Sequence, residues 1–120
     1  MEAERVNVVW ETYRNRKCLE FRFPQELTSA AAEEAIRAWR AELQSTGTAP
    51  LTIVWDCRRM KGYDSQARRV WQDALQEMRG RIATVWLVSG SPFVRLGAML
   101  MGKALSIEIK SVDSLERIGA

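Results

Sequence analysis

Four polar residues in the middle of the chain have the types and spacing to bind a partner or to carry a phosphate. Asp64, Ser65, Gln66 and Arg69 stand at the expected start of an amphipathic helix. A carboxylate or hydroxyl at such a position caps backbone N–H groups, and a phosphate on Ser65 would be stabilised by the same groups. The four residues therefore indicate either a plain helix cap or a docking surface for a partner protein.

A second set of small and polar residues follows two predicted strands, and it consists of Asp56, Ser89, Gly90 and Ser91. Neighbouring parallel strands end at one edge of an α/β sheet, and ligands bind at that edge. We therefore consider a shallow site for an anion or another small ligand, beside the plainer view that two connecting turns need these residue types. Neither Gly-Lys-Ser/Thr nor G-x-G-x-x-G occurs, so the set does not form a nucleotide phosphate loop.

Composition argues against catalysis and against metal binding. The 120 residues include no histidine, which removes the commonest general base and the commonest metal ligand. The two cysteines, Cys18 and Cys57, are expected to be buried free thiols. We therefore expect no catalytic residues, no metal and no cofactor.

The net charge of +3 is concentrated in one stretch, where seven basic and three acidic residues lie between Arg58 and Arg81. Such a stretch attracts an acidic partner, a phosphate or an anionic membrane surface, although a solvated helix face has the same composition. The five tryptophans fall in predicted strands and on apolar helix stripes. Because base stacking needs exposed rings beside basic groups, we do not expect a nucleic-acid partner.

The elements that must position these residues begin with a predicted hairpin. Val6–Trp10 is a short strand, and Lys17–Phe23 alternates apolar and polar residues as a half-buried strand does. The polar residues 11–16 are predicted to connect them. Pro24 stops the second strand, and Thr28 or Ser29 is expected to cap a helix that ends near Ser45.

Strands and helices then alternate to the end of the chain. The strand Leu51–Trp55 is nearly all apolar, as expected for a central strand covered on both faces. The later predictions are helix Asp64–Arg79, strand Arg81–Val88, helix Phe93–Ala104, strand Leu105–Ile109 and helix Ser111–Ile118. The order β-β-α-β-α-β-α-β-α predicts one α/β domain over residues 1–120, in which helices pack on a mostly parallel sheet with an antiparallel N-terminal edge hairpin.

The third predicted long helix is unusually apolar. Its apolar positions include Phe93, Leu96, Met99, Leu100 and Met101. A helix that is apolar nearly all round is either deeply buried or meets something else. A homodimer face, a groove for a partner and a peripheral lipid or membrane contact are therefore considered beside simple core packing.

The element order and one local pattern resemble the STAS superfamily, the fold of the sporulation anti-sigma factor antagonist. The resemblance covers about residues 6–118, and its most specific part is a strand ending at Asp56, a loop, and then Asp64-Ser65 opening a helix. In the bacterial regulators the second hydroxyl residue of the helix start is the phosphoacceptor. Gln66 occupies that position here, and Ala67 replaces the glycine that follows. Ser65 could therefore act as the phosphoacceptor only if the helix start were shifted by one residue relative to those regulators.

The resemblance implies a non-catalytic regulatory module that binds a regulatory protein by partner switching or scaffolding, without the usual phosphoacceptor. The chain is also similar to the STAS-like domains related to the lipid-carrier Sec14 group. That branch implies the alternative function, which is binding of a small apolar or anionic ligand between the third helix and the sheet. The acidic N-terminus lacks a signal-peptide pattern, so we expect a cytoplasmic protein.

Overall fold

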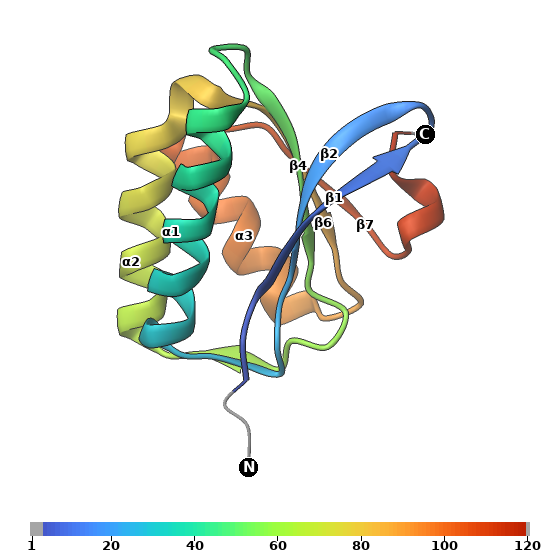
Figure 1. The fold of residues 1–120 in the computed structure, drawn as a ribbon. Coiled ribbons are helices and arrows are strands. Elements are labelled where there is room, and N and C mark those ends of the chain that lie inside the picture. The colour runs from blue at the N-terminus through green and yellow to red at the C-terminus, as the bar shows by residue number, and fades with distance from the viewer. Residues whose placement is uncertain (1–3, 120) are drawn as a thin grey trace.

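The computed structural model describes residues 4–119. It contains a five-stranded sheet with the strand order β1-β2-β4-β6-β7, and three helices pack on one face of that sheet (Figure 1). The main elements are β1 (Asn7–Tyr13), β2 (Arg16–Arg22), α1 (Ser29–Ser45), β4 (Leu51–Asp56), α2 (Ser65–Met78), β6 (Ile82–Val88), α3 (Pro92–Leu105) and β7 (Ile109–Val112). Two 3₁₀ turns, η1 (Arg79–Arg81) and η2 (Leu115–Arg117), follow α2 and β7.

The predicted sheet is confirmed, because β1 and β2 are antiparallel and the other neighbouring strands are parallel. The hairpin differs from the prediction in its length. Its connection is only two residues, Arg14 and Asn15, with φ angles of 50° and 65°. Two positive φ angles give a turn whose twist matches that of the strands. Residues 11–13 and 16 were wrongly predicted as connection, because an edge strand tolerates polar side chains.

The main core lies between the sheet and the helices. Phe21 is completely buried on β2, and its ring meets Trp39 of α1 and Trp71 of α2 edge-on, with centroids 5.3 and 5.5 Å apart. Edge-to-face pairs at these distances add to the hydrophobic stabilisation from burial. The aromatic cluster thus fixes both helices against the middle of the sheet.

The opposite face of the sheet carries no α-helix among residues 4–119 and is here called the helix-free face, yet β4 is buried on both of its faces, as predicted. Trp86 and Val54 lie on this face in a second buried cluster, which Ile118 completes. Figure 1 shows the C-terminal segment with η2 on the side of the sheet away from the helices. Arg14 holds this segment by donating hydrogen bonds to the carbonyl oxygens of Ile118 and Glu116.

The last two predicted elements were also wrong. Helix α3 continues to Leu105 and ends at Ser106, which has a left-handed conformation with φ of 56°. The strand therefore begins at Ile109, where it pairs with Val85 of β6. The helix predicted from Ser111 to Ile118 consists of the end of β7 and the 3₁₀ turn η2.

A two-stranded sheet of β3 (Glu26–Leu27) and β5 (Gly62–Tyr63) was not predicted. It ties the segment before α1 to the segment before α2. The Asp64 N–H also donates to the Leu27 carbonyl oxygen, with 3.2 Å between the two atoms. These bonds position the start of α2.

Candidate functional site

The residues predicted at the start of α2 lie together at one exposed helix end. Asp64 is the N-cap, and its Oδ1 accepts a hydrogen bond from the Ala67 N–H at 2.6 Å. Ser65, Gln66 and Arg69 are exposed on the first turns of the same helix. The plain capping role is therefore present, and the neighbouring side chains face solvent where a partner can reach them.

The second predicted set lies at the carboxyl ends of neighbouring strands, because Asp56 of β4 pairs with Val88 of β6. Asp56 is buried and forms two hydrogen bonds of 2.8 Å with the Arg58 guanidinium. Burial alone would raise the pKa of Asp56, but the side-chain and backbone hydrogen bonds from Arg58 outweigh it and lower that pKa. The Asp56 carboxylate thus stays charged, and both of its oxygens accept hydrogen bonds from Arg58 in the loop that follows β4.

The remaining side chains of this edge also serve the local structure. Ser89 is buried, and its hydroxyl accepts a hydrogen bond from the Ser91 N–H. Ser91 in turn caps α3 by accepting from the Val94 N–H at 3.3 Å. Gly90 is exposed between them. The predicted anion or ligand edge stays a prediction, with its polar side chains used in capping and turn formation.

Helix α3 presents most of its predicted contact residues to solvent. The exposed fractions of Phe93, Leu96, Met99 and Leu100 are 60%, 62%, 43% and 53%. Met101 differs, because it is buried and faces inward. The Phe93 ring stacks on Tyr63 with 5.7 Å between centroids. Since Tyr63 directly precedes Asp64, this stack connects the start of α2 with the exposed face of α3.

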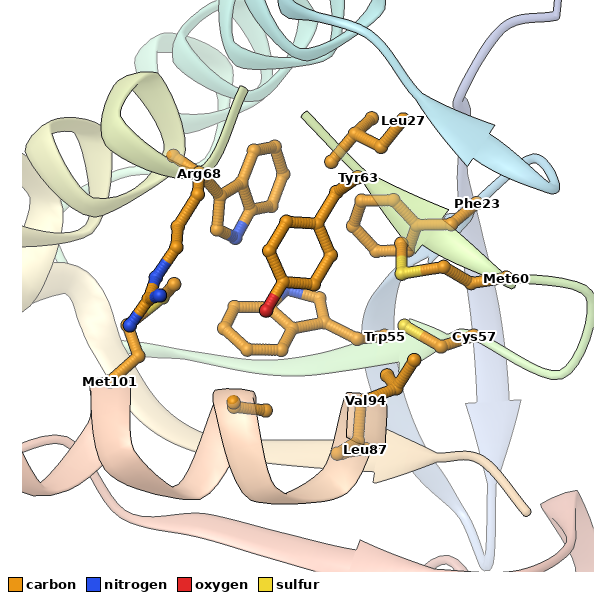
Figure 2. A pocket seen from close by; sticks show the side chains of 13 residues that line it. Phe23, Leu27, Trp55, Cys57, Met60, Tyr63, Arg68, Leu87, Val94 and Met101 are labelled. Carbon is orange, nitrogen blue, oxygen red and sulfur yellow. The ribbon is translucent and has the colours of Figure 1, made fainter. Parts of the chain in front are cut away.

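An apolar pocket lies between α2, α3 and the sheet (Figure 2), where the resemblance implied the alternative of ligand binding, which stays a prediction. Its volume is about 60 Å³. The pocket combines side chains from β4, β5, α2 and α3, among them Trp55, Tyr63, Arg68 and Met101. No local sequence pattern could have identified its lining residues, because they are up to 78 positions apart, from Phe23 to Met101.

A buried carboxylate on the helix-free face was also not predicted. Glu20 is 1% exposed, accepts a hydrogen bond from the Tyr13 hydroxyl, and forms an ion pair of 2.6 Å with Arg22. Burial of Tyr13, together with its hydrogen bond to Glu20 and the charge of that carboxylate, raises the pKa of Tyr13. The hydrogen bonds from Tyr13 and Arg22 compensate the buried charge of Glu20, so we interpret this network as structural.

The two cysteines are free and buried, as predicted. Burial raises the pKa of both Cys18 and Cys57, so each thiol is protonated at neutral pH and is a poor nucleophile. Within residues 4–119, no group of three or more cysteine, aspartate or glutamate side chains is placed to hold a metal ion. In the same range, no helix has the length and apolar character needed to cross a bilayer.

Comparisons with known proteins give structural matches but no sequence family. No protein-family model matches the chain, and no curated protein sequence matches it. A structure from Shewanella loihica PV-4, described as an uncharacterised protein of the DUF3478 family with a SpoIIAA-like fold, superposes with a TM-score of 0.81 at 12% identity. That match covers 96% of this chain and 91% of the other.

Two further matches are structures of the anti-sigma factor antagonist SpoIIAA itself. The unphosphorylated form gives a TM-score of 0.57 at 25% identity and covers 93% of each chain. The phosphorylated form, described as a Bacillus cell fate determinant, gives 0.61 at 21% identity and covers 93% of this chain and 96% of that one. These matches confirm the predicted STAS-like α/β fold.

Proposed function

We propose, from the SpoIIAA-like fold of this chain, that it is a non-catalytic regulatory domain of the anti-sigma factor antagonist type that acts by binding another protein. Similarity to structures of such an antagonist supports the regulatory role. One observation carries the proposed site, namely the stack of Tyr63 on Phe93. It joins two exposed sets into one surface, here called the α2–α3 surface: Asp64, Ser65, Gln66, Arg69, Phe93, Leu96, Met99 and Leu100.

The composition of the α2–α3 surface suits a protein partner. Four large apolar side chains of α3 are exposed on it, and monomeric proteins rarely expose such side chains in a contiguous patch. The polar residues at the start of α2 border this patch, and specific interfaces combine an apolar centre with a polar rim in the same way. A regulatory protein is therefore the proposed occupant, and a second copy of the chain is an outcome that the experiment below distinguishes.

We further propose that partner binding does not depend on a phosphate at the usual position. Gln66 occupies that position, and its amide cannot be phosphorylated. Ser65 is exposed but directly follows Asp64, whose carboxylate would repel a phosphate. The expected outcome is that Ser65→Ala binds the partner as the wild type does. Loss of partner binding in Ser65→Ala would instead assign a role to that hydroxyl.

The experiment is a pull-down from lysate of the source cells, with light scattering of the purified chain run beside it. Wild type is compared with Leu96→Asp and Gln66→Arg, which change the apolar centre and the polar rim. Arg40→Gln is the control, because Arg40 pairs with Glu77 on the outer sides of α1 and α2, away from this surface. We expect one regulatory protein to be retained by the wild type and the control and to be lost by both surface variants.

Two results would contradict the proposal. Retention of the same proteins by all four chains would show that the α2–α3 surface is not the docking site. A concentration-dependent dimer that Leu96→Asp dissociates would instead assign the apolar centre to self-association.

A further inference from the structure

Strand β1 forms one edge of the sheet, and no other strand within residues 4–119 pairs with its outer side. An open edge presents backbone groups that can bind a further strand, so folded proteins protect it by short strands, lysine, proline or bulges. β1 has none of these. It is seven residues long, its sequence NVVWETY lacks lysine and proline, and all seven residues pair with β2 in unbroken register. The other edge strand, β7, has only four residues and carries Lys110.

The geometry of the hairpin decides which backbone groups of β1 face outward. Both residues of the turn have positive φ, and a two-residue turn of this type places Tyr13 and Arg16 in a hydrogen-bonded pair. Such pairs alternate along an antiparallel ladder, so every second residue of β1 directs its N–H and C=O away from β2. These outward residues are Val8, Trp10 and Thr12. No backbone hydrogen bond within residues 4–119 uses their N–H or C=O groups.

We infer that β1 pairs antiparallel with β1 of a second copy of the chain, which joins two five-stranded sheets edge to edge. Two-fold registers that pair at least five residues of each strand are centred on Val9, Trp10 or Glu11. Centring on Glu11 sets two carboxylates opposite each other, and centring on Trp10 sets Glu11 opposite the apolar Val9. With Val9 at the axis, Glu11 faces Asn7 of the second copy, whose amide donates to the carboxylate. The same register sets Val8 opposite Trp10, a β-branched and aromatic pair that stabilises sheets.

The space beside this edge suits the second strand. Val8 packs on the helix side of the sheet and borders a cleft of about 310 Å³, which Ala35 and Ala38 of α1 also line. These small side chains of α1 leave room for the Trp10 ring of the second copy. In each copy the Trp10 indole N–H donates to Glu42 at 2.8 Å. A ring that is already held in place loses little conformational freedom when the strands pair.

The first test is disulfide crosslinking of Val9→Cys under mild oxidation. In the inferred register the two Val9 positions form a non-hydrogen-bonded pair with Cα atoms ~4.5 Å apart, which a disulfide can bridge. Thr12→Cys is the matched control, because Thr12 is exposed on the same strand and would lie ~20 Å from its own counterpart. The native Cys18 and Cys57 are buried and do not compete. We expect a covalent dimer from Val9→Cys and none from Thr12→Cys.

The second test is light scattering of the purified chain over a range of concentrations. The wild type should form a dimer that dissociates on dilution. Val8→Pro should raise the dissociation constant of the dimer at least about tenfold, because two symmetry-related hydrogen bonds are lost. This variant should still fold, since the Val8 N–H faces away from β2, and circular dichroism with urea unfolding checks it. Leu96→Asp should leave the dissociation constant unchanged, because α3 packs against β7 at the opposite edge of the sheet.

The inference is overturned if the wild type is monomeric at every concentration, which would leave the edge to a strand of another protein. It is also overturned if a folded Val8→Pro dimerises as the wild type does, or if Thr12→Cys crosslinks as readily as Val9→Cys. If Val8→Pro does not fold, the crosslinking result decides alone. Dissociation by Leu96→Asp would assign self-association to the α2–α3 surface instead. None of these outcomes depends on partner capture, so the result is independent of the proposed docking function.

Discussion

Individual side chains in this protein take roles that their type alone does not predict. Glu20 alternates with apolar residues in a strand, and such a position normally faces solvent. In the structure it is completely enclosed, and Tyr13 and Arg22 bind its two carboxylate oxygens. A buried carboxylate is tolerated because both oxygens are hydrogen-bonded and one partner is a cation.

The raised pKa of Tyr13 predicts a loss of stability in alkaline solution. The folded state holds the phenol proton above the ordinary tyrosine pKa of about 10, so the contribution is complete below that pH and decreases as the pH rises further. The free energy of urea unfolding should therefore fall above about pH 10, and it should fall less steeply in Tyr13→Phe. Equal slopes in the two proteins would refute this role of the Tyr13–Glu20 hydrogen bond.

At the scale of single elements, α3 has two chemically similar faces in different environments. Leu100 is 53% exposed, whereas the next residue, Met101, is 9% exposed and lines the pocket. The sequence does not show which face of α3 is buried. Most positions of the helix are apolar, so a buried apolar stripe cannot be distinguished from the exposed face by residue type. The packing of α3 against β7, where Gly102 lies close to Ile109, decides which face is inside.

A pair of adjacent substitutions measures that division. Leu100→Asp should change the free energy of unfolding by only about 0.5 kcal/mol, because surface changes are usually small. Met101→Asp should cost at least ~3 kcal/mol, because it places a carboxylate in an apolar pocket. Urea denaturation of both variants gives the two values. A comparable loss in Leu100→Asp would show that its side chain is part of the core.

At the scale of the whole molecule, the sheet is covered in two different ways. Three helices cover one face, and the C-terminal segment covers part of the other through Ile118, which is 2% exposed. The guanidinium of Arg14, at the tip of the β1–β2 hairpin, binds the backbone of this segment. The tip of the N-terminal hairpin and the C-terminal segment are therefore joined on the helix-free face, beside the cluster of Trp86 and Val54.

This arrangement predicts that the C-terminal segment contributes to global stability. Ile118→Ala should lower the free energy of unfolding by about 2–3 kcal/mol, because a large buried side chain is truncated. Arg117→Ala is the control, since its side chain is 70% exposed and its surface ion pair with Asp113 contributes little. Thermal and urea unfolding of both variants would measure the difference. An Ile118→Ala protein as stable as the control would show that the segment only rests on the sheet.

The sequence predicted only part of the candidate site. The cap at Asp64 followed from its place before an apolar stripe, because capping depends on residues three positions apart. The pocket residues Trp55, Tyr63 and Arg68 carry no such signal, because each looks like an ordinary strand, loop or helix residue in its own neighbourhood. Their common function as a wall arises only when β4, β5 and α2 meet.

The sequence by itself determined the α/β class, the antiparallel hairpin and the three long helices, because periodicity and caps reflect interactions between near neighbours in the chain. Tertiary structure alone decided that β7 starts at Ile109 and that the C-terminal segment, not an α-helix, covers part of one sheet face. It alone decided that the Trp55 indole N–H, which has no hydrogen-bond partner among residues 4–119, is buried beside an apolar pocket. The physical reason is the same in each case. Pairing register, burial and hydrogen-bond satisfaction depend on side chains that are far apart in the chain and meet only in the folded protein.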